Sequence, residues 1–130
     1  MSKYQNFIMT EEFLNDSKKA IFVFGDNTLR NGYGGAAALR NHPQTYGFIT
    51  KKYPDNQDTS FYRPTEYSAI FFDELVKLRE YIREEPFKTF YISQLGAGLA
   101  NKYYIWENII KKGLEKNLKN FSNVVFLWEE

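Results

Sequence analysis

Residues 21–40 read IFVFGDNTLRNGYGGAAALR, and this stretch decides how the chain is expected to fold. Its first four residues are β-branched or aromatic, which predicts a buried strand that ends at Gly25. Gly32, Gly34 and Gly35 then lead into three alanines that open a predicted helix. Glycine lets the backbone come close to a ligand, and a helix N-terminus favours an anion such as phosphate. The alternative is a tight strand-to-helix turn that binds nothing.

The same alternation of short apolar runs and helical patterns continues to the C-terminus. It predicts strands at residues 47–50, 89–93 and 124–128, and helices at residues 65–83 and 103–118. This β-α-β-α-β-α-β order from residue 21 predicts a three-layer α/β fold, with a mainly parallel sheet and helices on both faces. Residues 1–20 are ambiguous: residues 7–9 could form an edge strand and residues 11–18 a short helix.

The long helix has the clearest pattern. Thr65 is its expected N-cap, and Pro86 ends it. One face is apolar at three- and four-residue spacing, through Tyr67, Phe71, Leu75, Leu78 and Ile82. Gly113 lies inside the last predicted helix, where glycine costs roughly 1 kcal/mol against alanine.

Composition narrows the possible functions. The 130 residues fit one domain, spanning residues 1–130. With 17 basic and 16 acidic residues the net charge is +1, which gives no strong signal for nucleic acid or an anionic membrane. Cysteine is absent and there is one histidine, so we expect no metal site. The N-terminus has no apolar segment of signal-peptide or membrane-spanning length, so we expect no membrane partner and a cytoplasmic protein.

A second glycine segment, residues 94–99 (QLGAGL), follows the strand predicted at 89–93. Both glycine segments should open at the carboxyl ends of parallel strands, where ligands of α/β sheets bind. Lys51 follows the strand between them. The loop at residues 53–64 is rich in aromatic residues, and Arg63 within it is the arginine best placed to reach a phosphate, ahead of Arg30 and Arg40.

Three segments carry a resemblance to a known family: FGDN with GYGGAAALR, then YGFITKK, then FYISQLGAGL. From Ile21 to its end the chain resembles the macrodomain superfamily of ADP-ribose-binding modules. Its pattern is most similar to the branch that contains the terminal ADP-ribose glycohydrolases. That branch has a strand, a Gly-x-Gly-Leu loop and a Trp-bearing helix at nearly this spacing, and the helix expected here carries Trp106.

The resemblance implies a site. The first glycine segment would lie near the distal ribose of ADP-ribose, and the second would wrap its diphosphate through backbone amides. No cofactor is expected; the implied partners are ADP-ribose or a related nucleotide metabolite and ADP-ribosylated macromolecules. The expected ligand-binding residues are Asp26, Asn27, Gly32, Tyr33, Gly34, Gly35, Ala36, Arg63, Gln94, Leu95, Gly96, Ala97, Gly98 and Leu99.

The resemblance also raises the question of catalysis. Lys51 matches a lysine that acts as nucleophile toward the ribose in the glycohydrolase branch. That branch has an aspartate directly after Gly-x-Gly-Leu, and this chain has Ala100 there, which cannot transfer a proton. Asp26, on the facing segment, is the best candidate to replace it. Three hypotheses follow: an ADP-ribose-binding module, an ADP-ribosyl glycohydrolase that uses Lys51 and Asp26, and a nucleotide-independent interaction domain.

Overall fold

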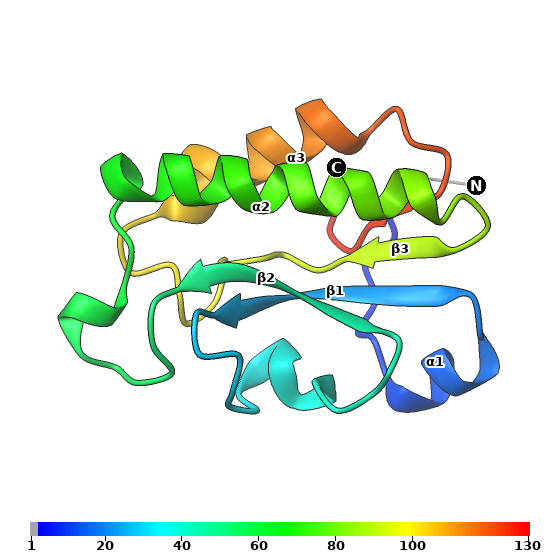
Figure 1. Cartoon of the computed structure of the whole chain (residues 1–130), viewed down its shortest axis with the longest axis horizontal. Coiled ribbons are helices and arrows are strands. Elements are labelled where there is room, and N and C mark those ends of the chain that lie inside the picture. Colours follow the sequence, from blue (N-terminus) through cyan, green and yellow to red (C-terminus); the bar gives the residue numbers. More distant parts are fainter. Residues whose placement is uncertain (1–2) are drawn as a thin grey trace.

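A four-stranded parallel sheet forms the centre of the protein, in a computed structural model that describes residues 3–130 (Figure 1). Its strands are β1 (Ala20–Asn27), β2 (Thr45–Lys51), β3 (Thr89–Ile92) and β4 (Val124–Phe126). Their order across the sheet is β2-β1-β3-β4, and every neighbouring pair is parallel. The parallel sheet predicted from the sequence is therefore confirmed, and Ile92 at the end of β3 pairs with Val23 of β1, its neighbour in the middle of the sheet.

Helices cover both faces of this sheet, as the alternating pattern predicted. The long helix α2 (Pro64–Glu84) and α3 (Lys111–Leu118) lie on one face, whereas α1 (Glu11–Asp16) and the 3-10 helix η1 (Gly35–Leu39) lie on the other (Figure 1). Side chains of β1 alternate between two apolar clusters, because successive strand residues point to opposite faces. Ile21 and Val23 belong to the larger cluster under α2 and α3, and Phe22 and Phe24 belong to the smaller one.

The apolar face predicted for α2 is confirmed, because all five of its residues are buried. The helix begins one residue before Thr65, which was the wrong choice of N-cap. Arg63 is the cap, and its backbone N–H donates to Glu66 Oε1 at 3.0 Å. Pro64 takes the first helical position, where a missing N–H costs nothing.

The N-terminal region and the first crossover differ from their predictions. Residues 7–9 form no strand, and the short helix α1 ends at Asp16. The helix predicted after Gly35 is a five-residue 3-10 helix, which ends at Leu39. Pro43 and the start of β2 at Thr45 leave little chain for a longer helix, and short helices gain little stability of their own.

Residues 103–118 also begin differently from a regular α-helix. The helical part begins with a five-residue π-helix, η3 (Trp106–Ile110), which continues directly into α3. A further 3-10 turn, η2 (Asp58–Ser60), lies in the loop between β2 and α2.

The outer edge of β2 is covered by side chains rather than by another strand. The backbone N–H of Ile49 donates to Glu74 Oε1 at 2.7 Å, and its carbonyl accepts from the Tyr67 hydroxyl. Both partners are buried residues of α2. Burial raises the pKa of Tyr67, so its hydroxyl keeps its proton and donates. These bonds satisfy the backbone groups of Ile49 at an edge that would otherwise be free to pair with another chain, and an antiparallel bridge between Lys51 and Phe61 covers the position two residues further along.

Candidate functional site

A cleft of about 290 Å³ opens where β1, β2 and β3 end. Three stretches of the chain wall it: residues 25–40, which include the first glycine segment, residues 50–54, and the second glycine segment with its neighbours, residues 93–100. The two glycine segments therefore meet at one site.

Most of the residues expected at the site line this cleft. Lys51 does so from the end of β2. The others are Asp26, Asn27, Gly32, Tyr33, Gly34, Gly35, Ala36, Gln94, Gly96, Gly98 and Leu99.

Three expected ligand-binding residues lie elsewhere. Leu95 is buried in the larger core, and Ala97 packs against the same core. Arg63 is exposed outside the cleft, where its guanidinium lies 4.4 Å from the centre of the Tyr103 ring and 3.3 Å from Asp58 Oδ2.

The floor of the cleft is a tight junction of all three stretches. A Cβ built on Gly25 would lie 3.1 Å from Thr50 Oγ1 and 3.4 Å from the Gly96 nitrogen. Gly96 itself has φ +77°, and a Cβ there would lie 2.8 Å from Ile110 Cδ1 in η3. The positive φ therefore favours glycine at position 96, and a side chain there would also have to displace the end of the Ile110 side chain. Gly98 differs, because a Cβ built on it would meet no protein atom within 4 Å.

Thr50 and Ser93 line the cleft but were not predicted from the sequence. Thr50 is buried and precedes Lys51, and Ser93 directly follows β3. Both positions lie at the carboxyl end of a strand, and that rule alone would have found them.

Asp26 contributes a carboxylate to the cleft, and this carboxylate is held by arginines. The residue is 4% exposed. Its two oxygens accept from Arg40 Nη1 and Nη2 at 3.0 and 2.7 Å, and Arg30 Nη1 is 3.3 Å from Oδ2. Paired charge-assisted bonds of this kind are strong and fix orientation. Asp26 is the one carboxylate among the described residues that line the cleft.

The side chain of Asn27 is also engaged by the protein. Its amide nitrogen donates to the Asn31 carbonyl at 2.7 Å, and its amide oxygen accepts from the Leu29 backbone at 3.0 Å. These bonds shape the turn that leads from β1 to the first glycine segment.

Lys51 brings a cation to the cleft. Its ammonium lies 4.7 Å from the centre of the Phe61 ring, and the ammonium of Lys102 lies 5.3 Å from the same centre. None of the ion pairs found within residues 3–130 uses Lys51. The lysine therefore adds positive charge to the cleft without a salt bridge, and Asp55 interacts with it electrostatically from a longer distance.

The wall formed by the second glycine segment carries no acid. Ala100 lines the cleft, and it is 8% exposed. The next residue is Asn101. Its amide nitrogen donates to Glu107 Oε1 at 2.7 Å, and its amide oxygen accepts at 3.0 Å from the backbone N–H of Trp106, the first residue of η3. Its polar atoms are therefore used at the start of the helix.

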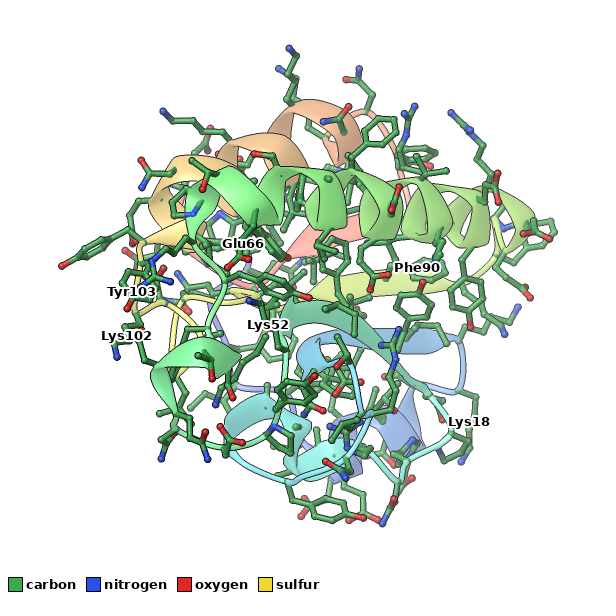
Figure 2. The ribbon with its side chains drawn as sticks, turned by 60° about the vertical axis from the view of Figure 1, so that its left-hand side comes forward. Lys18, Lys52, Glu66, Phe90, Lys102 and Tyr103 are labelled. Atoms are coloured by element: carbon green, nitrogen blue, oxygen red, sulfur yellow. The ribbon has the colours of Figure 1, made fainter. Side chains whose placement is uncertain are left out.

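A group of side chains around Asp58 joins the loop before α2 to the loop that follows the second glycine segment. Asp58 pairs with Lys102 at 2.8 Å and with Arg63, and it accepts from the Tyr103 hydroxyl. Lys102 and Tyr103 lie beside each other at this end of the molecule (Figure 2). Hydrogen bonds from Lys102 and Tyr103 lower the pKa of Asp58 to about 2.

A second cavity, of about 410 Å³, adjoins the cleft and shares Gly35, Ala36 and Ser93 with it. Its remaining walls are apolar side chains of the N-terminal segment, β1, η1 and the C-terminal segment: Phe7, Met9, Phe22, Leu39 and Leu127 among them. Ser93 supplies the one polar side chain of the cavity among the described residues. The site is therefore a cleft that carries charged and polar side chains, with a more apolar cavity beside it.

Two features are missing from the described part of the chain. Within residues 3–130, no three His, Cys, Asp or Glu side chains come together as ligands for a metal ion. No helix in that part combines the length and the apolar character needed to cross a membrane.

A family model described as a family of unknown function (DUF7831) matches residues 3–102. The chain belongs to this family. The match includes β1, β2, β3, Lys51 and both glycine segments, so it covers all three stretches that wall the cleft. No curated protein and no solved structure matches the chain.

Proposed function

We propose that this protein binds ADP-ribose, or a related nucleotide-ribose metabolite, between its two glycine segments, as a macrodomain-like module. The observation that carries the proposal is that the two cavities adjoin and share Gly35, Ala36 and Ser93 in their walls. A nucleotide-ribose has a flat aromatic base at one end and polar sugars and phosphates beyond it. The adjoining cavities offer matching surroundings.

The polar cleft suits ribose and phosphate groups. Gly35 and Gly98 present backbone with no protein atom within 4 Å of where a Cβ would stand, so a ligand can approach the main chain there. Backbone N–H groups in such segments can hold an anion without side-chain charge. Lys51 adds a cation that forms no salt bridge, which favours a ligand that carries phosphate.

The apolar cavity suits the base. Phe7, Phe22 and Leu127 give it an apolar lining, and an aromatic base gains from leaving water for such surroundings. Ligand pockets of drug size span roughly 300–1,000 Å³. The apolar cavity, at about 410 Å³, lies in that range, and the cleft of about 290 Å³ adjoins it.

One observation favours the second candidate, an ADP-ribosyl glycohydrolase. Lys51 lines the cleft, where a nucleophile toward the distal ribose would have to be. Two observations favour binding without turnover. Ala100 leaves no acid on the wall of the second glycine segment, and Asp26 is held by two guanidinium groups. We therefore favour the binding module.

A thermal-shift panel tests the proposal. The full chain is melted alone and with ADP-ribose, NAD, AMP, cyclic ADP-ribose or inorganic phosphate. A ligand present at 100 times its Kd adds about 2.7 kcal/mol to the free energy of unfolding. We expect the largest rise in Tm with ADP-ribose or a close relative. An unmoved Tm across the panel would favour the nucleotide-independent interaction domain.

A release assay separates the binding module from the enzyme. Wild type and Lys51→Ala are incubated with a mono-ADP-ribosylated protein, and free ADP-ribose is measured. We expect no release by either. Robust release by wild type that Lys51→Ala abolishes, with ADP-ribose affinity largely kept, would establish the glycohydrolase instead, because a nucleophile contributes mainly to the reaction step.

A further inference from the structure

Although Arg40 lines the cleft, most of the hydrogen-bond donors of its guanidinium bond to other groups of the protein. Its side chain is 13% exposed. Besides its two bonds to Asp26, its Nε donates to the Gly32 carbonyl at 2.9 Å, and its Nη2 donates to the Asn31 carbonyl at 3.0 Å. Four of the five N–H donors of the guanidinium are thereby occupied. Arg40 connects the end of β1 to the first glycine segment.

Asp26 is anchored from its other side through Arg30. Arg30 Nη1 lies 3.3 Å from Asp26 Oδ2 and donates to the Gly47 carbonyl at 2.7 Å. Its Nη2 is 3.8 Å from Glu74 Oε1, the oxygen that covers the edge of β2. Two carboxylates and two guanidiniums alternate along this chain of contacts, from α2 to the glycine segment, and Lys77 lies 3.6 Å from the other oxygen of Glu74, Oε2.

The backbone accommodates this arrangement at two positions. A Cβ on Gly47 would lie 2.3 Å from Asp26 Oδ2 and 3.0 Å from Arg30 Nη1, so the network occupies the space that glycine leaves on β2. Arg30 has φ 56°, a left-handed conformation that side-chain-bearing residues adopt at a cost. Its three contacts, to Asp26, Gly47 and Glu74, offset that cost.

We infer that Asp26 and Arg40 are positioning residues, which hold residues 31–35 as a wall of the cleft, and that Asp26 acts on a ligand only through Arg40. The inference deepens the proposed ADP-ribose binding and rests on it for the ligand alone. Residues 31–34 form no helix or strand, so fixing their backbone costs conformational entropy. The bonds from Arg40 to two consecutive carbonyls offset that cost. A carboxylate that accepts from two guanidiniums is poorly suited to proton transfer.

Hydrogen exchange of the unliganded protein tests the positioning role without any ligand. Arg40→Lys keeps the charge but loses the planar fork, so it cannot reach Asp26 and both carbonyls together. We expect the amide of Ala37, which donates to the Gly34 carbonyl at 3.2 Å, to exchange about ten-fold faster in Arg40→Lys and in Asp26→Asn, with β3 unchanged. Arg83→Lys, at an exposed arginine near the end of α2, is the matched control. Unaltered exchange of the Ala37 amide in a folded Arg40→Lys protein would overturn the inference, even if Asp26→Asn failed to fold.

Calorimetry with ADP-ribose tests how the two residues act on the ligand. We expect each single variant to raise Kd about ten-fold. The double variant Asp26→Asn/Arg40→Lys should raise it no further, because both changes break the same Asp26–Arg40 interaction. Kd of wild type and of Asp26→Asn should show the same pH dependence between about pH 5 and about pH 9. Additive losses, or a pH dependence that disappears in Asp26→Asn, would show that Asp26 contacts the ligand directly. Absence of ADP-ribose binding by wild type would instead refute the proposed function, and the exchange experiment would still decide the positioning role.

Discussion

Leu99 lies close to Gly34 across the mouth of the cleft: a Cβ built on Gly34 would lie 3.9 Å from Leu99 Cδ1. The two glycine segments, far apart in the sequence, therefore approach each other at the rim. A second close approach lies nearby, where a Cβ on Gly32 would be 3.6 Å from Pro54 Cβ. The rim is thus lined by small and apolar groups at these two points.

Shortening Leu99 should open this rim and leave the fold intact. Leu99 is 73% exposed, so Leu99→Ala should change the free energy of unfolding by no more than about 0.5 kcal/mol. We expect its Kd for ADP-ribose to rise about three- to ten-fold, since apolar cover over the ligand is lost. Urea unfolding and calorimetry measure the two effects. A Kd equal to that of wild type would show that the rim does not cover the ligand.

Filling the cleft from Gly98 should abolish binding. The position has room for a side chain and no positive φ, so Gly98→Val should fold and place its methyl groups where the ligand is expected. Gly98→Ala should give an intermediate Kd. Gly35→Val should also abolish binding, but Gly35 has φ +58°, so that variant is strained as well. Circular dichroism and calorimetry provide the readings; wild-type affinity in a folded Gly98→Val protein would remove this segment from the site.

The pKa of Asp58 reports on the contact between the two loops. Because its folded-state pKa of about 2 lies below that of the unfolded chain, the contact stabilises the protein above about pH 4 and is lost as the pH falls toward 2. Lys102→Met should raise this pKa toward its ordinary value, whereas the exposed-site control Lys112→Met should not. An NMR titration of the Asp58 carboxyl carbon measures it. The same pKa in wild type and Lys102→Met would contradict the ion pair.

Gly113 shows where propensity and packing disagree. Helix propensity predicts that Gly113→Ala gains roughly 1 kcal/mol. However, a Cβ at this position would lie 2.4 Å from Cε2 of Phe71, a buried residue of α2. We therefore expect Gly113→Ala to lower the free energy of unfolding by about 1–3 kcal/mol in urea, with Lys112→Ala within about 0.5 kcal/mol of wild type. A more stable Gly113→Ala protein would mean that α2 and α3 lie further apart.

The parts of the fold that depend on local pattern were predictable. The run of β-branched and aromatic residues marked β1, and three- and four-residue spacing marked the buried face of α2. The length of η1 was not predictable in this way, because three alanines favour helix but the chain must reach β2 within a few residues. Tertiary constraint overrode local propensity there, as it does at Gly113.

For the candidate site, sequence reasoning located the segments better than the individual side chains. Glycines and strand ends indicated where backbone would line a cleft, and that prediction depended only on topology. Arg63 was expected there because of its charge, yet Asp58 and Tyr103 hold it outside. Arg40 was considered only as a phosphate ligand, whereas it bonds to Asp26 and two carbonyls. Such pairings depend on long-range geometry that spacing along the chain does not encode.

An NMR titration of the ¹⁵N-labelled full chain with ADP-ribose tests the central claim most directly, because it reports both whether the ligand binds and where. We predict saturable shifts concentrated in the amides of residues 25–36, 50–51 and 93–100, with further shifts at residues 7–9 beside the apolar cavity. Amides on the exposed face of α2 should remain unchanged. A spectrum unaffected by ADP-ribose, or shifts confined to surfaces away from the two glycine segments, would contradict the account.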